Sequence, residues 1–171
     1  MPEIRLFVHA WTKRKEKRPA GVHSCEYRMN ESARGCTSVL RVHTGRLCTL
    51  LIRHGAHVEA RDSLLSETPL HKAVRSNAID NVAALIAFAS ARSRKLLRAT
   101  DVTGNTALHK AAALPVTDLA VWNMLLAADG AADVARTTNV DGLTVLQVAQ
   151  RAKNSLALAL LRALDAHAPA N

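Results

Sequence analysis

The chain has 171 residues, of which 49% are apolar and only 3% aromatic, and it carries a formal net charge of +9 at pH 7. This length is enough to bury a core without disulfides or a structural metal, and the scarcity of aromatic side chains favours closely packed helices over a β-sheet. Three cysteines, an odd number, indicate a reducing compartment and exclude a fully disulfide-paired secreted framework.

No apolar run approaches the ~18 residues that a membrane-spanning helix needs. The first apolar run, at residues 6–8, is too short for a secretory signal peptide. We therefore expect a protein of the cytoplasm or the nucleus that does not associate with membranes.

The positive charge is concentrated at the front of the chain. Residues 1–61 hold 12 Lys or Arg against 5 Asp or Glu, which accounts for +7 of the total. Residues 1–33 show no sustained apolar period, so we predict a basic, disordered tail there. Within it, residues 13–18 are five basic residues in six. This pattern is typical of a nuclear import signal or a nucleic-acid contact, and also of a solvated tail that contacts nothing specific.

Residues 34–62 contain apolar residues that could form two helical stripes, but no motif marks a helix start. We interpret residues 34–65 as a degenerate unit that caps one end of the domain. The apolar residues are Val39, Leu40, Leu47, Leu50, Leu51 and Ile52.

Three hexapeptides then recur at a spacing of 38: Thr-Pro-Leu-His-Lys-Ala from Thr68, Thr-Ala-Leu-His-Lys-Ala from Thr106 and Thr-Val-Leu-Gln-Val-Ala from Thr144. Each predicts a helix start, because a threonine hydroxyl caps free N–H groups and Pro69 suits the first helical position. Turn residues precede each hexapeptide, with Ser66 at the first in place of glycine.

A second apolar run of helical character follows each hexapeptide, at residues 82–88, 119–126 and 156–164. The unit is therefore a turn followed by two helices. We expect repeats at 66–103, 104–141 and 142–166, a repeat domain over 34–166, and a short C-terminal tail at 167–171.

The hexapeptides resemble the T-P-L-H-x-A signature of ankyrin repeats, whose usual period is about 33 residues. Residues 51–62 and Gly130-Ala131 resemble the family's second-helix ending and the loop after it. The resemblance covers residues 45–164 and implies an all-α solenoid of about four repeats with hairpin-like loops. The lengthened repeat before Thr106 is also similar to the ankyrin domain of inhibitors of NF-κB-type transcription factors.

The period of 38 exceeds the family's by about five residues. We expect the extra residues to lie in loops, at residues 90–97 in the first full repeat and at 114–116 and 131–135 in the next.

The resemblance implies structural roles for the signature residues, with His71 and His109 hydrogen-bonding across neighbouring loops and Gln147 taking their place in the third copy. The expected structural residues are Thr68, Pro69, Leu70, His71, Thr106, Leu108, His109, Thr144 and Leu146.

The resemblance also implies a partner surface made of loop tips and the exposed edge of each first helix. We expect Leu65, Val102 and Leu143 to lie along one edge and to contact a partner; the alternative is that such apolar loop residues are tucked against their neighbours or merely scattered. The candidate tip residues are Leu64, Leu65, Glu67, Val102, Thr103, Asn105, Val140, Asp141 and Leu143. The candidate helix residues are Arg75, Ser76, Ala113, Leu114, Arg151 and Ala152.

The histidines and cysteines of residues 23–48 were considered as zinc ligands, because His23, Cys25, Cys36, His43 and Cys48 lie close in sequence. Zinc sites usually show paired ligands such as C-x-x-C, and here only the first two are close together. We expect neither a metal nor a cofactor.

The sequence contains no nucleophile elbow, phosphate-binding glycine loop, or Cys/His pair with a supporting acid, so we expect no enzymatic activity. We expect a monomeric scaffold, adaptor or inhibitor that binds a protein partner, with nucleic acid not expected as a ligand. The alternative is a nuclear or nucleic-acid-associated regulator that acts through the basic tail.

Overall fold

The computed structural model describes residues 45–92, 95–114 and 117–166. Regular structure in these ranges is helical, apart from one isolated bridge between Thr138 and Thr144. The helices are α3 (Gly45–Arg53), α4 (Pro69–Arg75), α5 (Ile79–Arg92), α6 (Lys95–Arg98), α7 (Ala107–Ala113), α8 (Leu119–Ala127), α9 (Ala131–Arg136), α10 (Val145–Arg151) and α11 (Ser155–Ala166).

The expected basic tail, the first helix of the degenerate unit and the C-terminal residues 167–171 lie outside the described residues. So does the centre of the turn at residues 115–116.

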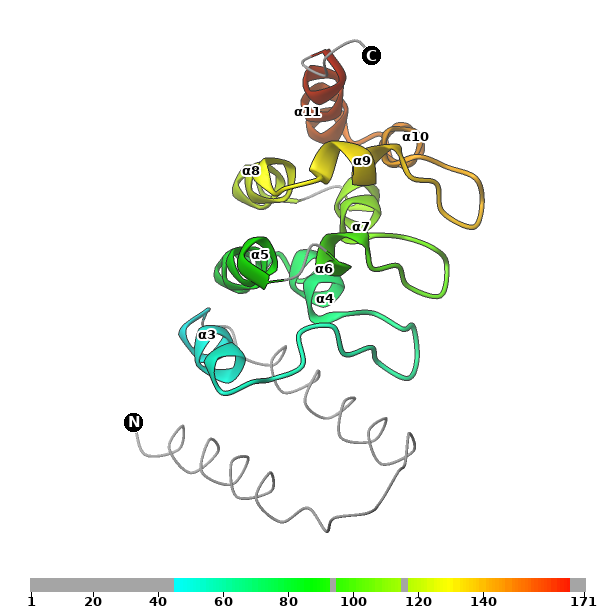
Figure 1. Cartoon of the computed structure of the whole chain (residues 1–171). Helices are drawn as coiled ribbons and strands as arrows, with labels where there is room; N and C mark the ends of the chain where they lie inside the picture. The colour runs from blue at the N-terminus through cyan, green and yellow to red at the C-terminus, as the bar shows by residue number, and fades with distance from the viewer. Residues whose placement is uncertain (1–44, 93–94, 115–116, 167–171) are drawn as a thin grey trace.

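The helices stack in two columns (Figure 1). The first helices α4, α7 and α10 form one column, in which α7 packs against both neighbours. The second helices α3, α5 and α8 lie beside it, and α11 packs on α8 and α10. The all-helical stack predicted from the repeats is confirmed.

The three signature threonines cap equivalent helices. Thr68, Thr106 and Thr144 have extended backbones with φ of −81°, −81° and −75° and stand immediately before α4, α7 and α10. In each case the side chain three residues later accepts a hydrogen bond from the threonine N–H, which completes a capping box. The hexapeptide therefore specifies a helix start by local chemistry alone.

The core lies between the two columns and between successive repeats. Leu70 and Leu108, the leucines of the first two hexapeptides, are fully buried. The second helices contribute many further apolar side chains. Fully or almost fully buried there are Val82, Leu85, Val121, Trp122, Leu125, Ala157 and Leu161.

The last repeat closes the stack with polar residues. Gln147 and Gln150 are exposed, whereas the corresponding His71 and Val74 of the first signature repeat are buried. Leu146 is half-buried at the position of the fully buried Leu70. A terminal repeat has no following neighbour, so polar residues at these positions keep its outer face compatible with water.

At 90–92, 95–97 and 131–135 the extra residues of the 38-residue period form helices, which corrects the expectation that they lie in loops there; Leu114 is not helical, and residues 115–116 lie outside the described residues. In the first full repeat they end in α6, whose Leu96 and Leu97 are buried, and in the next they form α9, whose Val134 and Ala135 are buried. Such apolar pairs must leave water, and helical turns pair most of the backbone polar groups that burial would otherwise leave unsatisfied. The helices α6 and α9 contact each other and lie one above the other in Figure 1.

Three hairpin-like loops project beyond the first helices (Figure 1). We call them finger 1 (residues 61–67), finger 2 (100–105) and finger 3 (138–143). An Asx side chain folds each one: Asp62, Asp101 and Asn139 each accept hydrogen bonds from two backbone N–H groups further along their finger.

Two residues before each capping threonine, the backbone turns through the left-handed region. Gly104 (φ +73°) and Gly142 (φ +72°) occupy this position in fingers 2 and 3, and Ser66 (φ +52°) occupies it in finger 1. Adjacent fingers are then joined by one backbone hydrogen bond each. The Val102 N–H donates to the Leu65 carbonyl at 3.0 Å, and the Val140 N–H donates to the Thr103 carbonyl at 3.0 Å.

The two glycines allow a matched test of finger packing. Gly142→Ala should cost about 1–2 kcal/mol of unfolding free energy, because a left-handed backbone disfavours any Cβ and nothing else lies within 4 Å. Gly104→Ala should cost more, because its Cβ would meet the Val140 nitrogen at 2.8 Å and push the next finger away. Urea unfolding measures both, and equal losses would contradict a tight contact between fingers.

Candidate protein-binding surface

Two buried histidines join each helix start to the next finger. The His71 Nδ1 accepts from the Thr68 N–H at 3.2 Å and lies 2.8 Å from the Thr68 hydroxyl, while its Nε2 lies 2.9 Å from the Asn105 carbonyl. His109 repeats this arrangement with Thr106 and with the Leu143 carbonyl, at 3.1 Å. Since Nδ1 accepts, the proton belongs on Nε2, and both rings are neutral.

Burial lowers the pKa of His71 and of His109, because a protonated ring would lose its hydration. The carbonyl and carboxylate partners oppose this effect without reversing it. Neutral imidazole is therefore the form that the folded stack selects. These two residues hold the fingers in place and are not available to a ligand.

An ionic cluster lies beneath the first two fingers. The Lys110 Nζ lies 2.6 Å from Asp101 Oδ2 and 3.2 Å from Glu67 Oε1, and the Arg75 Nη2 lies 3.5 Å from Glu67 Oε2. The contacts to Glu67 lack good hydrogen-bond geometry, so its fully buried carboxylate is balanced by charge alone. Nearer the start of the stack, Lys72 makes a separate pair of 2.8 Å with Asp62.

The cluster changes the acidity of its members. Burial alone would raise the pKa of Asp101, but hydrogen bonds from Lys110, Thr103 and the Asn105 backbone outweigh it and lower that pKa to about 2. Burial would lower the pKa of Lys110, but its two carboxylate partners raise it instead. Both groups are therefore charged across the physiological range.

Glu67 was expected at an exposed tip, and the structure corrects this, because its side chain is fully buried beneath the finger. Glu67, Asn105 and Leu143 each stand directly before a capping threonine, at the base of a finger. Asn105 bonds Thr103 within its own finger and Asn139 of the next, and Leu143 is half-buried. The expected edge of Leu65, Val102 and Leu143 is therefore not a row of equivalent tips.

The equivalent tip residues are instead Leu64, Val102 and Val140, each four residues before its threonine. Their exposed fractions are 86%, 55% and 75%. Leu65 is less exposed, at 39%, and Thr103 and Asp141 are exposed beside the row. Because backbone hydrogen bonds join neighbouring fingers, the three apolar tips lie in register along the stack.

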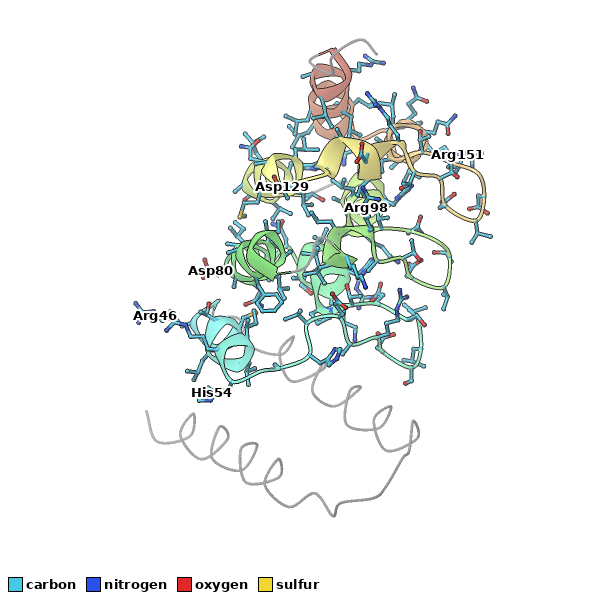
Figure 2. The ribbon with its side chains drawn as sticks, in the orientation of Figure 1. Arg46, His54, Asp80, Arg98, Asp129 and Arg151 are labelled. Atoms are coloured by element: carbon cyan, nitrogen blue, oxygen red, sulfur yellow. The ribbon has the colours of Figure 1, made fainter. Side chains whose placement is uncertain are left out.

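The candidate residues of the first helices occupy the ends of these helices. Arg75 lies in the last turn of α4, and its side chain is half-exposed although it contacts Glu67. Ser76, Ala113 and Arg151 are exposed, and Leu114 and Ala152 are half-buried. Figure 2 shows Arg151 beside finger 3, on the opposite side of the stack from Arg46 and Asp80.

The sequence matches the family described as ankyrin repeats (3 copies) over residues 39–136. The chain belongs to the ankyrin-repeat family. Ankyrin repeats are typically protein–protein interaction modules and are typically non-catalytic. A comparison with curated proteins gives no similar sequence.

The described part of this ankyrin chain offers no cluster of three His, Cys, Asp or Glu side chains that could hold a metal ion. Of the five histidines and cysteines weighed as zinc ligands, only Cys48 lies within it; this thiol is buried, and burial raises its pKa to about 11. None of the described helices has the length and apolar character that crossing a membrane requires.

The sequence reasoning missed the residues that shape the ankyrin fingers. Two of these features form repeated patterns in the sequence. An Asp or Asn stands five or six residues before each capping threonine, and a lysine stands four residues after each of the first two capping threonines. The buried setting of Glu67 had no such signal, because it depends on a lysine 43 positions later that only the fold brings near.

Acid should weaken the stack through its buried histidines. The unfolded chain binds protons as the pH falls below about 6.5, whereas the folded imidazoles resist protonation to lower pH. Their contribution is therefore complete above pH 6.5, and the unfolding free energy should fall as the pH drops below it.

The change His71→Gln tests this mechanism. At the start of α10 the amide oxygen of Gln147 accepts from the Thr144 N–H, as the His71 ring accepts from Thr68 at the start of α4. Glutamine at position 71 should therefore preserve the cap of α4 while removing the titrating group. Thermal melting between pH 7.5 and 5 should show a shallower pH dependence for the variant. If the double variant His71→Gln, His109→Gln shows the same change of melting temperature with pH as the parent chain, the buried imidazoles have no such role.

The ionic cluster predicts a strong non-additivity. Lys110→Val alone should cost about 3–5 kcal/mol, because it leaves the buried Asp101 without a cationic partner and the buried Glu67 with only Arg75 at 3.5 Å. The positions 38 residues further along the chain already carry the neutral set Val148, Asn139 and Asn105 in place of Lys110, Asp101 and Glu67. The triple variant Lys110→Val, Asp101→Asn, Glu67→Asn should therefore recover most of this loss in urea unfolding. A triple variant as unstable as Lys110→Val alone would contradict the predicted coupling between the three positions.

Proposed function

We propose that this chain is a non-enzymatic protein-binding module, a scaffold, adaptor or inhibitor, whose partner lies against the finger tips and the adjoining ends of the first helices. The observation that carries the proposal is the row of Leu64, Val102 and Val140, apolar and more than half exposed in register on three successive fingers. The core does not need these side chains. Aligned exposed apolar residues are typical of a contact surface.

The polar candidates around the row support the same surface. Thr103 and Asp141 lie on the tips, and Ser76, Ala113 and Arg151 are exposed at the ends of the first helices. The fold fixes the backbone of each of them and leaves their side chains out of the core, although the Thr103 hydroxyl bonds Asp101 and Asn105 within finger 2. Residues of this kind set partner choice in a stacked-repeat protein.

The alternative function, a nucleic-acid-associated regulator, depends on the basic run at residues 13–18, which lies outside the described residues. No observation on the described surface favours it, so the proposal rests on the fingers. We place the module in the cytoplasm or the nucleus, as a monomer until its partner binds.

Binding and stability should separate at the tips. Leu64→Asp and Val140→Asp should each reduce partner capture at least about fivefold, because an apolar anchor contributes roughly 1–3 kcal/mol to a complex. Their unfolding free energies should change by no more than about 0.5 kcal/mol. Affinity capture with quantitative mass spectrometry and urea unfolding measure the two effects.

The controls lie elsewhere on the same chain. Leu119→Asp changes a leucine that is 48% exposed on α8, in the other column, and should leave capture intact. Leu108→Ala in the core should lose about 2–5 kcal/mol of stability. If the tip variants unfold as readily as Leu108→Ala, or capture the same proteins as the parent chain, the apolar row is not a binding surface.

A further inference from the structure

The charges on the finger side of the stack do not cancel. Beneath the fingers the ion pairs are balanced internally: Lys72 faces Asp62, and the pair of Lys110 and Arg75 faces two carboxylates. Arg151 corresponds in α10 to Arg75 in α4, is exposed, and makes no ion pair with any described residue.

At the other end of the row, Arg61 keeps its positive charge. Its guanidinium donates hydrogen bonds to the Thr100 and Ser66 carbonyls, which hold it across the bases of fingers 1 and 2 without neutralising it. The exposed carboxylate beside the tips is that of Asp141. Each end of the apolar row therefore carries one arginine that makes no ion pair with any described residue, Arg61 or Arg151, against the exposed carboxylate of Asp141.

A cationic surface attracts acidic protein segments and nucleic acids alike, and the tips distinguish the two. Sequence-tolerant binding of single strands uses aromatic side chains as stacking platforms. Here the tips are aliphatic, and among the described residues Trp122 is fully buried and Phe88 half-buried on the second helices. Leucine and valine tips fit apolar side chains better than bases.

We propose that the occupant of this surface is an extended acidic protein segment that places apolar side chains on the finger tips and carboxylates toward Arg61 and Arg151. This rests on the proposed function and adds the chemistry of the partner. Packed helices lie about 8–10 Å apart, and an extended chain in the polyproline II conformation advances about 3.1 Å per residue and returns to the same face every third residue. The segment therefore carries an apolar residue at about every third position, with acidic residues between.

The test selects binders from a displayed random 12-residue peptide library against the immobilised full chain. Recovered peptides should carry Asp and Glu at about twice or more their library frequency and apolar residues near every third position. A fluorescein-labelled copy of the most enriched peptide should lose about tenfold in affinity with Arg61→Gln, Arg151→Glu, measured by anisotropy.

The double variant is also the control for the basic front of the chain, which it leaves intact. An acidic preference that persists in selection against Arg61→Gln, Arg151→Glu comes from outside these two arginines and overturns the proposal. Arg162→Glu, an exposed arginine on α11, should keep the parent's selectivity and affinity.

The outcomes separate the two proposals. Peptides that need Leu64 and Val140 but show no acidic preference would leave the binding function standing and overturn the chemistry proposed here. A failure to recover any peptide that depends on these tips counts against both. Tight binding of a random-sequence 20-nucleotide RNA that Arg151→Glu abolishes would replace the acidic segment by nucleic acid.

Discussion

The fold depends on hydrogen bonds that cross from one repeat to the next. A single helix pair cannot bury both faces, so each repeat must be positioned by its neighbour. His71 does this with one ring, because its two nitrogens bind the start of its own helix and the Asn105 carbonyl of the following finger. His109 does the same one repeat later. The two histidines thus fix the start of a helix, the position of the following finger and the spacing between repeats. The core leucines pack around that framework.

The ionic cluster shows that neighbouring positions must change together. Lys110 is balanced by an aspartate of its own finger and by Glu67 of the previous one. In the next repeat the lysine position is Val148, and both acidic positions are asparagine. A buried charge without a partner is costly, so no single member can be exchanged alone. The sequence therefore offers a charged and a neutral solution to the same packing problem within one molecule.

Much of the stack could be predicted because its signals are short-range. The capping threonines, Pro69 and the apolar runs of the second helices act within a few residues of the structure they specify. The burial of Glu67, the packing of α6 against α9 and the row formed by Leu64, Val102 and Val140 could not be predicted in this way. Each depends on contacts between residues about 35 to 45 positions apart, whose geometry exists only once the repeats have stacked.

The fingers also determine how such a molecule can change length. Leu65 and Thr103 each offer a carbonyl to the N–H of the next finger, and Asp141 holds the corresponding position in finger 3 with no further finger among the described residues. A tandem duplication of one 38-residue unit would meet the same donors, acceptors and apolar surfaces that the existing units already present to one another. Recombination within such a gene would therefore yield longer or shorter proteins without inventing a new interface, and each added unit would lengthen the recognition surface by one finger.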